Sequence, residues 1–437
     1  MTFFLFLLVN ATLFLRPAEL FPDLAQLPIY ETLMISCCIG AFERMKRQLT
    51  AESLMRQPIT VCVLGLWAAV VLSHLSHFFL YGVRETGVIF LKTVVYYLMF
   101  VALVDTPQRL RQLLLTVAGC ASLMVALCVI DYVELVDFEF VTHISDSDDD
   151  FSETGEEARV LRMRGTGIFQ DPNDISLVIV CAGVLCTYFL FDRKAGWRRL
   201  VWCAPLAVLA TALLCTRSRG GLLAAGAAAI TVLMFRYGKT AAIVGGGLAG
   251  GIMSLIAGRQ ANINLGGGTG QERIRMWAEG LDALKSPDIL FGIGMGEYAD
   301  LAGLVAHNSF VHAYVELGFF GGTLFFGCFF FAALALHRLS QTTAGEIDAD
   351  VARFLPYMAA ALAGWATGML SLSRCYVVPT YLMFGLTTAY LNLASRRRAA
   401  DRPPIVWNQA WVTRLVAGSA VVLAGLFVFV RVFVRWG

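Results

Sequence analysis

Charged residues are scarce in this chain of 437 residues: they make up 15% of it, whereas hydrophobic residues make up 58%. The mean hydropathy is +0.68. A soluble globular domain contains about 25% charged residues. The composition therefore excludes a soluble protein and indicates one that crosses a membrane several times. The formal net charge of +2 gives no reason to expect a nucleic-acid partner.

Motifs of nucleotide-dependent enzymes are also missing. The sequence contains no P-loop and no dinucleotide-binding fingerprint after a strand. It shows no internal repeat, and the stretches expected in the cytoplasm are too short to fold alone. We therefore expect one integral-membrane domain over residues 1–437, and no enzyme that uses cytosolic nucleotides.

The eleven cysteines do not form a disulfide framework, because all but Cys375 lie within or at the edge of apolar runs. Cysteines placed in this way are typical of small buried hydrophobic residues. We expect no disulfides, no metal site and no cofactor.

Apolar runs long enough to cross a bilayer core recur along the chain, and their length and continuity favour helices over barrel strands. The first run lacks the basic leader and cleavage site of a signal peptide, so we interpret it as the first span. The sequence predicts an all-α polytopic membrane protein with about 12–13 transmembrane helices. The runs lie near residues 2–15, 28–43, 58–80, 86–104, 111–132, 173–191, 199–215, 220–235, 240–257, 309–336, 354–372, 379–394 and 412–434.

Lysine and arginine collect in alternate loops, which indicates that those loops and the N-terminus are cytoplasmic. The loops with unusual polar residues then fall on the outer face. They are residues 133–172, the turn 216–220, the large loop 258–308, and residues 373–378.

The outer loop 133–172 is acidic and then basic. Its alternating aspartates resemble a calcium loop, but Phe151 stands where such a loop needs glycine, so a solvated acidic loop is favoured. Arg164 follows, and the stretch from Gly165 to Asp174 reads as two turns and a helix cap. The acidic residues are Asp146, Asp148, Asp149, Asp150, Glu153, Glu156 and Glu157.

Arg217 and Arg219 lie between two apolar runs with almost no loop between them. An arginine at this depth usually faces a polar cavity or partner, although both side chains could also reach lipid headgroups. Gly220 and Gly221 favour an anion site, because glycine lets a large group approach the N–H donors of a helix start.

The large loop 258–308 carries Arg273, Arg275 and Trp277 on a segment, residues 272–284, that reads as an amphipathic helix on the membrane surface. One of these arginines could simply pair with Glu272 or Glu279, a contact that stabilises by less than about 1 kcal/mol when exposed. The alternative is a pair of planar guanidinium groups that bind phosphate oxygens.

His307 stands at the end of this loop, beside Asn308 and directly before an apolar run. A histidine at a helix start is often only a cap or a packing residue. Its arginine-rich surroundings suggest instead that it takes a proton from a sugar hydroxyl or orients that hydroxyl. Tyr314 and Glu316 are near enough in sequence to assist.

Together these motifs resemble the O-antigen ligase and polymerase superfamily over roughly residues 165–325. The order of the motifs is more specific than any one of them. They are Gly167 to Phe169, Pro172-Asn173, Ser218-Arg219-Gly220-Gly221, Arg273 four residues before Trp277, Pro287, Gly292-Ile293-Gly294, His307-Asn308, and Glu316 to Gly321.

The resemblance implies a GT-C-like, metal-independent, inverting glycosyltransferase on the outer side of the bacterial inner membrane. Its donor would be a glycan on undecaprenyl diphosphate, and its acceptor a hydroxyl of lipid A core or of another glycan. It implies catalytic roles for Arg219, Arg273 and His307. Second-rank contacts to the diphosphate or glycan are expected from Arg217, Arg275, Arg164, Asn308 and Tyr314.

Two alternatives stay open. A polymerase would use the same donor but a lipid-linked repeat unit as acceptor. A transporter or flippase for a lipid-linked substrate would use the arginines to bind phosphate and His307 to relay protons.

Overall fold

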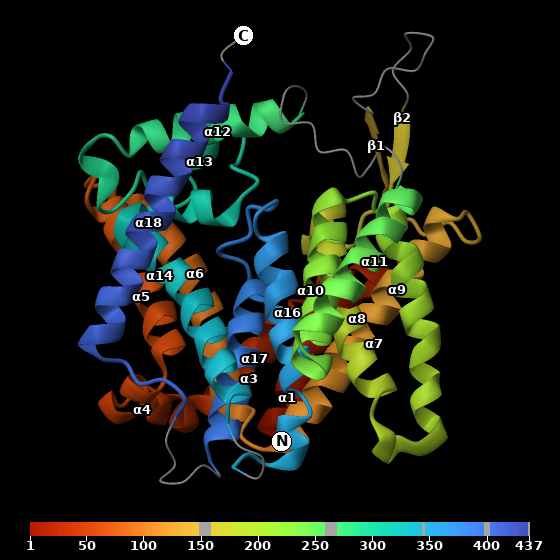
Figure 1. Ribbon diagram of the computed structural model, residues 1–437. Helices are drawn as coiled ribbons and strands as arrows, with labels where there is room; N and C mark the ends of the chain where they lie inside the picture. The colour runs from red at the N-terminus through yellow and green to blue at the C-terminus, as the bar shows by residue number, and fades with distance from the viewer. Residues whose placement is uncertain (148–158, 258–268, 343–345, 397–402, 436–437) are drawn as a thin grey trace. The chain divides into compact units, whose positions relative to one another are not determined.

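The computed structural model describes residues 1–147, 159–257, 269–342, 346–396 and 403–435, and this part of the chain is almost wholly helical (Figure 1). Each of the thirteen apolar runs coincides with a helix, so the all-α fold is confirmed. These helices are α1 (Thr2–Leu15), α3 (Ile29–Gln48), α5 (Pro58–Leu75), α6 (Leu80–Leu103), α7 (Pro107–Tyr132), α8 (Pro172–Leu190), α9 (Cys203–Cys215), α10 (Arg219–Tyr237), α11 (Lys239–Ala257), α14 (Ser309–Ser340), α16 (Leu355–Gly368), α17 (Val378–Ser395) and α18 (Gln409–Phe433).

Eight described segments are long and apolar enough to cross a membrane: α5, α6, α7, α8, α10, α14, α18, and α9 together with the 3₁₀ helix η3 (Arg193–Trp202) before it. The chain is a multi-pass membrane protein. That α1, α3, α11, α16 and α17 also cross the membrane stays a prediction, as does the orientation.

Short elements connect the long helices. In the loop 133–172, β1 (Ile144–Ser147) pairs antiparallel with β2 (Arg159–Arg162). Most of the predicted acidic cluster, residues 148–157, lies outside the described part of the chain. The other short elements are α2 (Pro17–Leu20), η1 (Pro22–Leu24), α4 (Ala51–Arg56), η2 (Gly167–Phe169), α12 (Thr269–Ala283), η5 (Pro287–Ile289), α13 (Tyr298–Ala302) and α15 (Ala349–Ala352).

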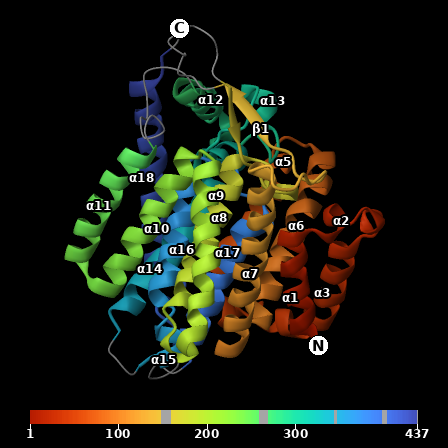
Figure 2. The ribbon, with the colours of Figure 1, turned by 90° about the vertical axis from the view of Figure 1, so that its right-hand side faces the viewer.

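The contacts divide the chain into two compact units, which are described separately. The first unit comprises residues 1–40, 106–262 and 352–368. In it, α8 packs against α7, α9, α10 and α16, and Figure 2 shows α8, α9 and α10 side by side. The second unit comprises residues 41–105, 263–351 and 369–437. There α14 packs against α5, α12, α17 and α18.

In the second unit, α14 is interrupted at Gly318, which has a left-handed backbone (φ 66°). At the break, nearby backbone groups of α14 lose their hydrogen-bond partners within the helix. Residues 290–294 provide new partners for these groups. Ile293 and Gly294 donate their N–H groups to the carbonyls of Val315 and Glu316, at 3.1 and 3.0 Å. The two glycine motifs of the sequence therefore meet, and their backbone groups satisfy one another.

Helix α12 runs across the direction of α18 in Figure 1. Its inward side is apolar, with Ile274, Ala278 and Leu281 buried, while Glu272 and Glu279 are exposed. The amphipathic helix predicted for this segment is therefore present. Its position on a membrane surface stays a prediction.

Candidate functional site

The predicted site residues divide between the two units. Arg164, Arg217 and Arg219 lie in the first. The second contains Arg273, Arg275, His307, Asn308 and Tyr314.

In the first unit, two sequence motifs meet at the start of α10. The Ser218 hydroxyl caps this helix by accepting the N–H of Gly221 at 3.0 Å, and it donates to the side-chain oxygen of Asn173 at 2.7 Å. The Ser176 hydroxyl donates to Ser218 at 3.2 Å. The Pro-Asn motif therefore fixes the turn that carries Arg217 and Arg219.

Both arginines of this turn are exposed. Arg217 has a left-handed backbone (φ 49°), a strained conformation for an arginine, and Arg219 is the first residue of α10. The role expected for Gly221 needs correction: a Cβ there would lie 2.5 Å from the Cβ of Ser176. This glycine lets α10 pack closely against α8, and does not leave space for a ligand.

Arg164 is held by the loop around it. Its guanidinium donates to the carbonyl and the hydroxyl of Thr142, both at 2.8 Å. His143 lies 3.0 Å from Asp131. Burial lowers the pKa of His143, and Arg164 adds to this effect while Asp131 opposes it. Arg164 thus has a structural role in this loop, and phosphate binding by it stays a prediction.

In the second unit, a hydrogen bond connects α12 to Ala306, the residue before His307. The indole N–H of Trp277 donates to the carbonyl of Ala306 at 2.6 Å. Arg273 is four residues before Trp277 on the same helix, so both side chains lie on one face. The two residues with the strongest predicted roles in this unit, Arg273 and His307, are therefore carried by segments in direct contact.

Arg275 has a different environment. Its guanidinium donates to the carbonyl of Arg435 at 2.8 Å, and nearby the Gln271 side chain donates to the carbonyl of Phe433 at 2.9 Å. These contacts attach α12 to the end of α18, so Arg275 helps to position the helix that carries Arg273.

His307 has a left-handed backbone (φ 48°) and is partly exposed. The buried Asn308 caps α14, because its side-chain oxygen accepts the N–H groups of Phe310 and Val311. The hydroxyl of Tyr314 lies 2.7 Å from that of Ser419, and the side chain is fully buried. Asn308 and Tyr314 therefore have structural roles, and their contact with a substrate stays a prediction.

The sequence analysis gave no role to His312, which forms a buried pair with Glu316. The two side chains are 2.8 Å apart, and Glu316 also accepts the N–H of Tyr298 at 3.2 Å. Burial raises the pKa of both Tyr298 and Tyr376, and the negative charge of Glu316 adds a smaller effect in the same direction. Both phenols therefore keep their protons at neutral pH. The spacing of four residues on a helix was the signal that could have revealed the pair.

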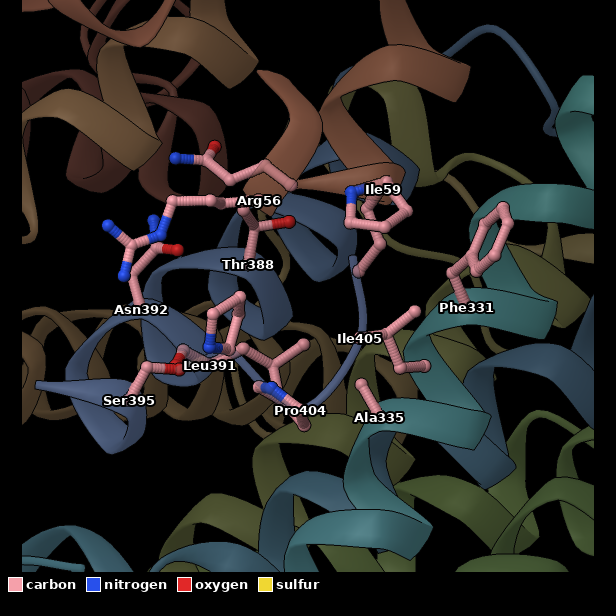
Figure 3. Close-up of a pocket in the computed structure, with 13 residues that line it drawn as sticks. Arg56, Ile59, Phe331, Ala335, Thr388, Leu391, Asn392, Ser395, Pro404 and Ile405 are labelled. Carbon is pink, nitrogen blue, oxygen red and sulfur yellow. The ribbon is translucent and has the colours of Figure 1, made fainter. Parts of the chain in front are cut away.

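The pocket in Figure 3 lies near the opposite end of α14, where Phe331 and Ala335 line it together with Arg56, Thr388 and Asn392. None of the predicted site residues lines it. Within the described parts of the chain, no three His, Cys, Asp or Glu side chains come together in a way that could hold a metal ion.

The fold defines the class of protein: a multi-pass helical membrane protein. Arg219 begins α10, and His307 lies directly before α14, so polar side chains stand at the starts of two long helices. Residues 204–326 match the family model described as O-Antigen ligase. The match runs from α9 into α14 and includes Arg217, Arg219, Arg273, Arg275 and His307. It confirms the resemblance seen in the motifs and supports a glycosyltransferase function of the O-antigen ligase or polymerase type. No curated protein matches the chain in a sequence comparison.

Proposed function

We propose that this protein transfers a glycan from undecaprenyl diphosphate to a hydroxyl of an acceptor glycan, as an O-antigen ligase with lipid A core as acceptor. The observation that carries the proposal is the hydrogen bond between Trp277 and Ala306, because it holds the helix of Arg273 against the segment of His307. A cationic side chain for a leaving phosphate and a histidine for a hydroxyl are the two groups that such a transfer needs.

In the proposed reaction the acceptor oxygen attacks the anomeric carbon, and the bond from that carbon to the diphosphate breaks with inversion. The diphosphate departs with the bonding electrons. Arg273 binds its oxygens and stabilises the negative charge that develops there, and we assign the same chemistry to Arg219 of the first unit. His307 takes the proton of the acceptor hydroxyl. Because arginine keeps its charge at all relevant pH values, these residues need no metal ion to bind the diphosphate.

The first unit has an apolar groove that would hold the polyprenyl chain of the donor. It lies between α8, α9 and α10, over residues 179–187, 206–213 and 225–233, and has a volume of about 410 Å³. Among the described residues that line it, Thr187 alone has a polar side chain. Ala225 is six residues after Arg219, or about 9 Å along the helix axis. A polyprenyl chain in this groove would have its diphosphate near the exposed arginines.

Filling this groove should weaken use of the donor. Gly183 lines the groove, and a Cβ added there meets no atom within 4 Å, so Gly183→Phe introduces a ring at this wall of the groove. We expect the KM for the lipid-linked donor to rise about tenfold or more, since burial of the chain supplies binding energy. Gly226→Phe is the matched control, because Gly226 is equally unobstructed but does not line the groove. An equal KM for the two variants would show that the groove does not hold the donor.

The proposed function is tested with purified protein in detergent and a chelator. A polyprenyl-diphosphate-linked glycan is offered with lipid A core or with a second lipid-linked glycan. We expect product on lipid A core, unchanged by the chelator. Lengthened lipid-linked chains would identify a polymerase, and loss of transfer on chelation would contradict the metal-independent mechanism.

The location of the reaction follows from the same proposal. We place the protein in the bacterial inner membrane, with its N-terminus in the cytoplasm and the arginines and His307 at the periplasmic face. Alternation of the basic loops along the sequence supports this orientation. In a variant whose eleven native cysteines are replaced, a labelling reagent in the periplasm should reach a cysteine introduced at residue 217 and not one introduced at residue 338.

A further inference from the structure

The loop before α17, residues 369–377, is docked on the start of α14 through Ser309. The N–H of Ser309 donates to the carbonyl of Met369 at 2.8 Å, and its hydroxyl donates to the carbonyl of Leu372. The same hydroxyl accepts the N–H of Arg374 at 2.9 Å. The backbone of Arg374 is therefore hydrogen bonded to a residue only two positions after His307.

The other side of this loop is also fixed through its backbone. The hydroxyl of Thr380 donates to the carbonyl of Arg374 at 2.7 Å, and the hydroxyl of Tyr381 donates to that of Cys375 at 3.1 Å. Thr93 donates to the carbonyl of Tyr376 at 3.3 Å. These bonds fix the backbone of Arg374 beside α14 before any ligand arrives, as a binding residue requires.

The start of α14 has few backbone donors left for an anion. Ser309 gives its N–H to Met369, and Phe310 and Val311 give theirs to the side chain of Asn308. These three N–H groups already have partners, so an anion at the start of α14 needs a side chain to bind it. Arg374 supplies a permanent positive charge here, and its side chain is partly exposed.

We propose that Arg374 is a third phosphate-binding arginine, acting with Arg273 on the anionic group that reacts beside His307. A guanidinium can bind two phosphate oxygens at once, which gives both affinity and orientation. This inference rests on the proposed function. The phosphate belongs to the donor diphosphate or to a phosphorylated acceptor, and the experiment separates the two sources.

The experiment uses the full chain in detergent and three variants: Arg374→Gln, Arg374→Lys and, as a control, Arg414→Gln. Arg414 is an exposed arginine of the same unit that stacks on Trp411 at 4.5 Å. Binding of inorganic diphosphate is measured by calorimetry. The KM is measured for the lipid-linked donor and for acceptors with and without phosphate.

We expect Arg374→Gln to weaken diphosphate binding about 10- to 100-fold, Arg374→Lys to weaken it less, and Arg414→Gln to leave it unchanged. A raised KM for the donor alone assigns Arg374 to the donor diphosphate. A raised KM only for the phosphorylated acceptor assigns it to that acceptor.

Unchanged diphosphate affinity and unchanged KM values in a folded Arg374→Gln protein would overturn the proposal. If the wild-type protein transfers no glycan but the variant still loses diphosphate binding, the proposed function fails and the assignment of Arg374 stands.

Discussion

Replacing His307 by asparagine is expected to reduce the rate of glycan transfer by about 10²- to 10⁴-fold, the usual contribution of a general base. The donor should still bind, because the arginines are untouched. The KM for the donor should therefore change little while kcat falls. The measurement is steady-state transfer from a lipid-linked glycan by protein of confirmed helical content and thermal stability.

Asparagine is chosen because the backbone of residue 307 is left-handed (φ 48°). Asparagine tolerates this conformation better than most residues, whereas alanine would add backbone strain to the loss of the imidazole. His337→Asn is the control, since His337 is an exposed histidine at the far end of the same helix. A His307→Asn protein with nearly normal kcat would show that the histidine serves only the local fold.

Replacing Gly318 by alanine is expected to prevent the second unit from folding normally. The added Cβ would lie 2.4 Å from the carbonyl carbon and oxygen of Leu290, which are backbone atoms that cannot rotate away. The positive φ of Gly318 adds strain for any L-residue. We estimate a cost of about 3 kcal/mol or more, from the clash and the strain together.

This prediction is measured as thermal unfolding of the detergent-purified protein. Gly425→Ala is a suitable control, because a Cβ at Gly425 in α18 meets no atom within 4 Å. Alanine there should be neutral, or stabilising by up to about 1 kcal/mol. If Gly318→Ala unfolded at the same temperature as the control, the contact between the Gly-Ile-Gly segment and the break in α14 would not exist as described.

The length and continuity of the apolar runs were sufficient to predict the helices, since lipid leaves a chain few other ways to satisfy its backbone. Each of the thirteen predicted runs has its helix, and the amphipathic segment that carries Arg273 is a helix as well. The motif order also indicated the family, and the match over residues 204–326 agrees with it.

Contacts between distant segments could not be predicted. Nothing in the sequence near Ser309 shows that it binds the backbone of Arg374, 65 residues later. Likewise, Gly221 was expected to make space for a ligand, but it makes space for Ser176 of α8. Such roles depend on which surfaces pack together, and a single sequence does not contain this information locally.

Residue type also does not reveal which polar residues near a candidate site serve the local fold and which are left for the proposed mechanism. Asn308 and Tyr314 have suitable chemistry for binding a sugar, yet the structure uses the first as a helix cap and the second to hold Ser419. Arg275 and Arg164 similarly donate to backbone carbonyls. The exposed Arg219 and the partly exposed Arg273 and His307 are the residues on which we base the proposed mechanism.

The most direct test of the central claim follows both products of the reaction in one assay. Purified protein receives a polyprenyl-diphosphate-linked glycan and an acceptor glycan, and the released polyprenyl diphosphate is quantified beside the new glycosidic bond. We predict equal amounts of both with the wild-type protein, and at least about 10²-fold less of both with Arg273→Gln. Bound donor without release of polyprenyl diphosphate would contradict a glycosyltransferase and favour a carrier of lipid-linked glycans.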